Sequence, residues 1–140
     1  MNEMNATTKR ENFAGCCLAG ADLTKADLHD ADLEEMVLSG ANLTDADLCG
    51  AKMARAVLTE ACLVGAVLMN ADMSDADLHG ADLTEADLFN SNLTGASMVG
   101  AKMSQATFGN ANLAGADLTG ADLTDACFAG ANLTGVDFFM

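Results

Sequence analysis

A large apolar residue recurs at every fifth position of this chain without interruption. The series runs from Phe13 to Phe138, and each of its 26 members is Leu, Phe or Met. We call this residue i. A fixed internal period constrains the fold more than any other feature of a sequence. Position i−2 is Ala in 21 of the 26 repeats, and the exceptions are Glu11, Cys16, Met36, Ser91 and Val136.

A period of five excludes both regular secondary structures as the basis of the repeat. Residues five apart on an α-helix are rotated by about 140°, so the large residues would spread around the whole helix. On a β-strand, residues five apart fall on opposite faces. A chain that bends after every five-residue segment instead keeps the side chains of i and i−2 inside and those of i−1, i+1 and i+2 outside. The sequence therefore predicts a solenoid with an aliphatic bore.

The outward positions have the chemistry of turns. Twelve of the 13 glycines occupy i+2, where a corner needs backbone freedom, and only Gly109 lies elsewhere. Asp and Asn are common at i−1 and Thr and Ser at i+1, residue types whose side chains hydrogen-bond the backbone in turns. The chain contains no Pro, so every backbone N–H is available for bonds between stacked coils.

The pattern A-(D/N)-L-T-G, as in 116–120 and 131–135, resembles the pentapeptide-repeat (repeat-five-residues) family. The resemblance covers residues 12–140, which we expect to form one domain, while residues 1–11 are expected to be an N-terminal tail or cap. It implies an all-β fold, a right-handed quadrilateral β-helix of about 6.5 four-sided coils built from 26 uninterrupted repeats. At the spacing of paired strands the rod would be about 31 Å long.

Two departures from the repeat predict local irregularity. Met36 replaces an inward Ala beside an outward Val37, which predicts a bulge unless the flexible Met side chain adapts. The coil at 51–70 is the most irregular, because it combines Lys52 and Arg55 with outward apolar residues that we expect to be exposed. We also expect a ladder of stacked amides on one face, formed by Asn92, Asn112 and Asn132.

The composition limits the classes of partner. The net charge is −15, from 21 acidic and six basic residues, which disfavours direct binding to nucleic acid or to an anionic membrane. No apolar run is long enough to span a membrane and the N-terminus lacks a signal pattern, so we expect a cytoplasmic protein. The five irregularly spaced cysteines imply no disulfide framework.

The titratable residues do not form a catalytic set. His29 and His79 are 50 residues apart, on opposite faces of a four-sided coil, and neither has a nucleophile and an orienting residue beside it. A bore filled with Leu offers no pocket. We therefore predict no enzyme, no catalytic residues and no cofactor. His29 and Cys49 stack one coil apart beside Asp27 and Asp47, but this spacing matches no standard metal site, so none is predicted.

An apolar column on one face is a candidate interaction patch. Phe89 lies one coil after Met69, with Val67 and Cys49 beside them, so we group Val67, Met69, Phe89 and Cys49 as this patch. Scattered surface hydrophobicity is the alternative interpretation, because single exposed apolar residues are common. Clustering on one flat face favours a contact surface.

The C-terminal residues indicate a second contact. A solenoid needs a polar terminal cap, whereas the last residues here are apolar. A two-fold pairing of C-terminal ends, giving a homodimer, would bury them. The alternative is that Phe139 and Met140 fold back as a lid. The candidate dimer end comprises Val136, Phe138, Phe139 and Met140.

The acidic residues are divided almost evenly among the four faces, with net charges of −3, −4, −4 and −4. This gives about one charge per 2 Å of axis, close to the about 1.7 Å of duplex DNA, although solubility alone also explains such a coat. The acidic surface includes Asp32, Asp77, Asp82, Asp87, Asp117 and Asp122.

Three functions are consistent with these features. The first is a non-catalytic scaffold for protein–protein interaction. The second is suggested by the resemblance, because a quinolone-resistance subset of the family resembles B-DNA and engages DNA gyrase or topoisomerase IV. The protein would then be a DNA-mimicking modulator of a type II topoisomerase. The third is a metal or small-molecule binder at the His29–Cys49 column.

Overall fold

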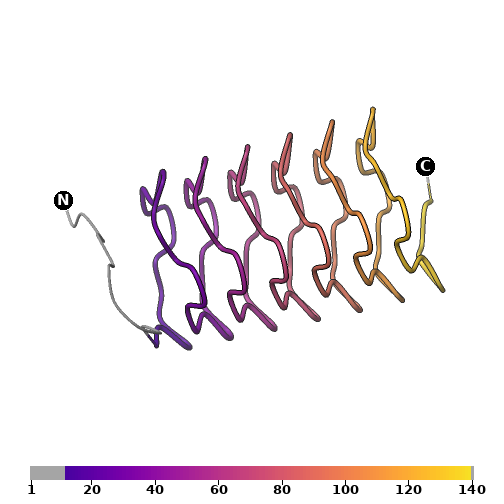
Figure 1. The fold of residues 1–140 in the computed structure, drawn as a ribbon. Coiled ribbons are helices and arrows are strands. Elements are labelled where there is room, and N and C mark those ends of the chain that lie inside the picture. Colours follow the sequence, from indigo (N-terminus) through magenta and orange to yellow (C-terminus); the bar gives the residue numbers. More distant parts are fainter. Residues whose placement is uncertain (1–11, 140) are drawn as a thin grey trace.

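The computed structural model describes residues 12–139. The proposed tail or cap at 1–11, and the part of Met140 in the dimer end, lie outside the described residues. Figure 1 shows the chain winding as stacked coils along one axis, with the two ends of the described chain at opposite ends of the rod.

Parallel bridges give the coil its period. They join each i−1 residue to the residue 20 positions later, from Asn12–Asp32 to Asp117–Asp137. One coil is therefore four repeats, which confirms a four-sided β-helix. Each repeat contributes a single bridged residue, so residues 12–139 contain neither a continuous strand nor a helix. Accordingly, nothing in this range could serve as a membrane-spanning helix.

We number the four faces by their first large residue. Face 1 begins at Phe13, face 2 at Leu18, face 3 at Leu23 and face 4 at Leu28, and each face continues every 20 residues along the rod.

Three backbone hydrogen bonds per repeat hold adjacent coils together. The N–H of residue i donates to the i−1 carbonyl of the next coil, as Leu33 does to Lys52 at 2.7 Å. The N–H at i+2 also donates forward, from Glu35 to Ala54 at 3.0 Å. The N–H at i−1 donates backward, from Lys52 to Ala31 at 2.9 Å. Two of the three donors therefore point toward the C-terminal coil.

The predicted bulge at Met36 and Val37 is wrong. Val37 bridges both Cys17 and Val57 in the regular register. Met36 is buried in the core. Its unbranched side chain fills the space of an inward Ala without displacing the backbone.

The core is a column of i and i−2 side chains, as the periodicity predicts. Leu38, Ala41 and their equivalents are fully buried over most of the rod. Phe108 and Phe128 stack at a centroid separation of 4.7 Å. Ser91, the buried polar exception, donates its hydroxyl to the Leu88 carbonyl at 2.8 Å, so it introduces no unpaired polar group.

Every corner requires a left-handed backbone. All i+2 residues from Gly15 to Gly135 have positive φ, and 13 of these 25 residues are not glycine. A left-handed conformation costs a residue with a Cβ about 1–2 kcal/mol. Glycine is therefore favoured at the corner but is not obligatory.

The corner glycines differ in what lies beside them, which predicts unequal costs of substitution. Gly40 has nothing within 4 Å of a Cβ, whereas a Cβ on Gly50 would overlap the Asp30 carboxylate. Gly40→Ala should lower the free energy of unfolding by about 1 kcal/mol through backbone strain alone. Gly50→Ala should lower it further because Asp30 must move. Denaturant unfolding of both variants measures the difference.

An Asp30→Ala background supplies the control for this comparison. Removing the carboxylate should reduce the cost of Gly50→Ala to that of Gly40→Ala. Equal costs for the two glycine variants in the unmodified chain would show that the Asp30 side chain moves freely.

Candidate protein-interaction surface

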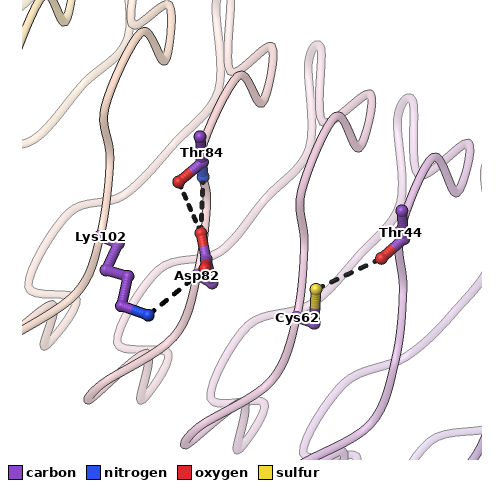
Figure 2. A network of polar contacts seen from close by, with 5 residues as sticks. All are labelled: Thr44, Cys62, Asp82, Thr84 and Lys102. Carbon is purple, nitrogen blue, oxygen red and sulfur yellow. Dashed lines mark hydrogen bonds and ion pairs between the residues drawn. The ribbon is translucent and has the colours of Figure 1, made fainter.

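A hydrogen-bonded motif explains the sequence preference at i−1 and i+1. The Asp82 carboxylate accepts the Thr84 backbone N–H at 3.1 Å and the Thr84 hydroxyl at 2.6 Å (Figure 2). Asn42 makes the same two contacts with Thr44 through its amide oxygen, at 3.1 and 2.6 Å. The side-chain oxygen closes the turn whether or not it is charged.

The fold therefore does not require a charge at i−1. Nevertheless 11 of the i−1 residues are Asp and only five are Asn. Two bridges even pair Asp with Asp, at Asp27–Asp47 and Asp117–Asp137. Like charges directly opposite each other destabilise a pairing. The acidity is thus a property of the surface that the fold tolerates rather than needs.

Several carboxylates are held ionised by their turns. The hydroxyl and N–H of Thr24 lower the pKa of Asp22, and Thr119 and Thr124 do the same for Asp117 and Asp122. Partial burial raises the pKa of Asp82, but bonds from Thr84 and the nearby Lys102 ammonium, 3.6 Å away, lower it by more. Hydrogen bonding to the charged form is the physical cause in each case.

Side chains of successive coils also contact each other outside the core. On face 3, the Thr44 hydroxyl lies 3.2 Å from the Cys62 sulfur, and Lys102 reaches back to Asp82 (Figure 2). On face 1, the Arg55 guanidinium lies 3.0 Å from Glu35, one coil before it.

The predicted acidic residues lie on all four faces. Asp122 is exposed and the others are half-buried beside their turns. Their distribution along the axis, however, is uneven. Face 1 carries seven charged side chains between Asp32 and Asp75 and none beyond them, and face 4 carries none after Asp87. After Asp87 the charge is therefore confined to faces 2 and 3.

The apolar patch is brought together on face 4. Backbone bonds from Gly50 to Met69 and from Asn70 to Phe89 show that the column is stacked coil on coil. Phe89 is 42% exposed, whereas Val67, Met69 and Cys49 are less exposed, each being half-buried. Phe89 rests on the next coil at Gly109, where a Cβ would lie 2.9 Å from its ring. The reason for the one glycine outside the corners is thus visible only in the structure.

The outward apolar side chains of the coil at 51–70, which we call the belt, are less exposed than predicted. Val57 and Val64 are half-buried and Ala54 is buried, because neighbouring coils cover the base of each outward side chain. Phe89, not this belt, is the large apolar side chain that projects from the middle of the described rod.

The His29–Cys49 column does not assemble a metal site. The His29 imidazole lies 3.3 Å from the Asp30 carboxylate, beside it in the chain. Within residues 12–139 no three His, Cys, Asp or Glu side chains converge in a way that could hold a metal ion.

The C-terminal end exposes apolar surface. Phe139 is 77% exposed and Phe138 is 42% exposed, while Val136 packs against the core. The lid predicted as an alternative is wrong for Phe139, whose N–H bonds Asp137 and whose carbonyl accepts from Gly120, holding the side chain outward. Leu133, which the repeat places inside, is 38% exposed because no described coil covers it.

Replacing Thr84 tests the role of the turns in the pH dependence of stability. The pKa of Asp82 is lower in the folded chain than its ordinary value near 3.8. Its hydrogen bonds therefore stabilise the fold fully above that value and are lost as the pH falls through the lower folded pKa. Thr84→Val should cost less than about 1 kcal/mol at neutral pH, since the site is partly solvated, and nothing at strongly acidic pH.

Thr59→Val is the matched control for this measurement. The Thr59 hydroxyl bonds the neutral Ser39 hydroxyl at 2.9 Å, so its cost should not change with pH. Denaturant unfolding across acidic and neutral pH measures both variants. A cost of Thr84→Val that stays constant with pH would contradict the assignment.

The fold and these surfaces define the class of the protein as an all-β solenoid repeat protein with no helix in its described part. A family model for pentapeptide repeats matches the chain in eight copies, over residues 16–54, 37–75, 51–88, 71–110 and 101–138. The chain belongs to the pentapeptide repeat family. Proteins of this family form right-handed quadrilateral β-helices and are generally structural or interaction proteins.

Several solved structures are similar to this chain. HetL of the cyanobacterium Nostoc sp. strain PCC 7120, a pentapeptide repeat protein involved in regulating heterocyst differentiation, is 32% identical, with a TM-score of 0.53. The alignment covers 89% of this chain and 75% of HetL. A pentapeptide repeat protein from the thylakoid lumen of Arabidopsis thaliana is 36% identical over 79% of this chain and 70% of its own, with a TM-score of 0.36.

QnrB1, a plasmid-mediated fluoroquinolone resistance protein, is 20% identical in a trypsin-treated form. That alignment covers 94% of this chain and 86% of QnrB1, with a TM-score of 0.33. No curated protein sequence matches the chain significantly.

Proposed function

We propose that the protein is a non-catalytic interaction scaffold, a right-handed acidic rod of 26 repeats in about 6.5 coils that presents its surface to a protein partner. The observation that carries the proposal is the excess of Asp over Asn at i−1, at 11 against five positions. Asn42 and Asp82 make the same turn, so the fold is indifferent to this choice. A surface that retains charge the fold does not need serves an interaction or the solubility of the rod.

The patch on face 4 gives this acidic surface an apolar anchor. The exposed Phe89 ring lies beside Gly109 of the next coil, and the Phe89 backbone N–H donates to the Asp87 carboxylate at 3.0 Å. Half-buried Met69 and Val67 extend the apolar area toward Asp47. A partner surface with an apolar pocket and a basic rim complements this arrangement.

We infer a cytoplasmic location, for which the support is that all five cysteines are free thiols.

Variants that remove charge without changing the turns test this proposal. Asp77, Asp117 and Asp122 can each be replaced by Asn, the residue that the fold already accepts at i−1. Immobilised wild-type protein should retain a partner from a host lysate at low salt, and the triple variant should lose it with an unchanged circular dichroism spectrum. Phe89→Asp should also release the partner if face 4 provides the anchor.

Elution of the captured partner with rising salt is the control for the role of charge. Binding through the acidic field must weaken as salt rises. Capture of the same proteins by the triple variant, or capture that persists at high salt, would mean that the field does not recognise the partner. Solubility would then be its only role.

A DNA-mimicking modulator of DNA gyrase or topoisomerase IV is the second candidate. The density of about one charge per 2 Å of axis favours it, since duplex DNA has one per about 1.7 Å. Because faces 1 and 4 carry no charge after Asp87, the DNA-binding groove of a topoisomerase would have to contact faces 2 and 3 there.

A supercoiling assay separates mimicry from other scaffold functions. Added wild-type protein should inhibit gyrase or protect it from a quinolone, and the Asp77, Asp117 and Asp122 triple Asn variant should do so less, because it carries three fewer charges on faces 2 and 3. No effect of the wild-type protein at micromolar concentration would contradict the DNA-mimic candidate without contradicting the scaffold proposal.

We also propose self-association through the C-terminal end, for which the support is the exposure of Leu133, Phe138 and Phe139. Because each repeat directs two N–H donors and one carbonyl toward the C-terminal side, two identical edges would oppose donors to donors. Such a contact would therefore depend on apolar side chains rather than on continued backbone pairing.

A further inference from the structure

The C-terminal half of face 1 is a flat surface without charge. It comprises residues 91–95, 111–115 and 131–135, which we call the neutral window. Its outward side chains are only Asn, Thr and Ala, and its corners are glycine. The N-terminal half of the same face carries seven charged side chains, from Asp32 to Asp75. The change from charged to neutral is complete within one coil.

A row of amides runs along the window. Asn92, Asn112 and Asn132 are bridged coil to coil. The predicted amide ladder forms between Asn132 and Asn112 at 3.0 Å, whereas Asn92 donates to Asp72 instead, at 3.0 Å. The structure gives the Asn112 amide nitrogen no acceptor among residues 12–139. Asn112 and Asn132 are exposed, so amide N–H donors face outward.

The corners of the window supply acceptors. Gly95, Gly115 and Gly135 are exposed, and their carbonyl oxygens accept no backbone hydrogen bond within residues 12–139. A Cβ on Gly115 would have nothing within 4 Å and one on Gly135 only the Gly115 backbone, whereas the Asp75 carboxylate of the preceding coil lies at the Gly95 corner. At Gly115 and Gly135 the window therefore combines uncharged donors and acceptors on a surface that another surface can approach closely, and the Asp75 carboxylate marks its N-terminal edge.

We propose that the neutral window binds the window of a second copy of this chain, with the two rods side by side and antiparallel. A parallel arrangement would place Asp32, Glu34 and Glu35 against the same residues of the second copy. The antiparallel arrangement directs the two charged halves to opposite ends, with Asn112 near the two-fold axis and Asn92 facing Asn132 of the partner subunit. An interface of this two-fold type needs a self-complementary patch, which the amide donors and glycine carbonyls provide.

The charge of the whole rod selects this occupant. A basic partner is drawn to the acidic faces, where the charge lies, rather than to the window. An acidic partner is repelled everywhere except where charge is absent. Another copy, with a net charge of −15, is such a partner and is present at equal concentration. The inference is independent of the scaffold proposal.

The two interactions respond oppositely to salt. Lateral pairing of two acidic rods should strengthen as salt screens their repulsion, whereas capture of a basic partner should weaken. Sedimentation velocity of the full chain, at rising concentration and at low and high salt, should therefore show a dimer whose fraction increases with both.

Asn112→Asp tests the window because it adds a charge without changing the turn. The residue keeps an acceptor for the Ala114 N–H, now at 3.2 Å, and Asp already fills 11 equivalent positions. Near the two-fold axis the two new charges would face each other, so this variant should sediment as a monomer where the wild-type protein is a dimer. Asn42→Asp makes the same change at the equivalent position on face 3, where the side-chain oxygen also accepts the Thr44 hydroxyl, and should leave the dimer intact.

Three results would overturn the proposal. A wild-type protein that stays monomeric at every concentration and salt removes the interface. Equal dimerisation of the Asn112→Asp and Asn42→Asp variants, both folded by circular dichroism, shows that the window is not the contact. Loss of the dimer with Phe139→Asp, but not with Asn112→Asp, assigns the association to the C-terminal end instead.

Discussion

The backbone hydrogen bond between adjacent coils is the interaction on which the rest of the structure depends. A single five-residue segment cannot bury its own Leu, and a single coil would leave the backbone N–H groups of i, i+2 and i−1 without a partner. Stacking satisfies both requirements together, since the bonds from Leu33 to Lys52 and from Glu35 to Ala54 also set the inward side chains of adjacent coils in contact. Stability in such an array comes from intrinsic repeat terms and nearest-neighbour interfaces.

Different positions of the repeat form the core, the corners and the turns, so the charge of the surface can change without disturbing the fold. The bore uses i and i−2, the corner uses i+2, and the turn at i−1 needs only an oxygen acceptor. Asn42 and Asp82 show that amide and carboxylate serve equally well there. The charge of the rod can therefore vary from repeat to repeat at little cost to folding.

The distribution of charge differs between faces 2 and 3 and faces 1 and 4. Faces 2 and 3 carry all the charge after Asp87, whereas faces 1 and 4 have no charged residue after Asp75 and Asp87 respectively. The acidic side suits a basic partner, and Phe89 adds an apolar anchor at the edge of the charged region of face 4. The neutral window on face 1 suits contact between copies. The two kinds of contact can coexist because they use different faces and respond oppositely to ionic strength.

The sequence by itself determined the repeat, its phase, the inward residues and the corner glycines, because a five-residue period is legible in one dimension. It also supplied the net charge and the members of the face 4 column. The tertiary structure decided how exposed each member is: neighbouring coils cover Val57 and Val64, Met36 fits without a bulge, and Phe89 lies on Gly109. These outcomes depend on contacts between residues in adjacent coils, and side-chain direction across a coil boundary is not encoded in any single repeat.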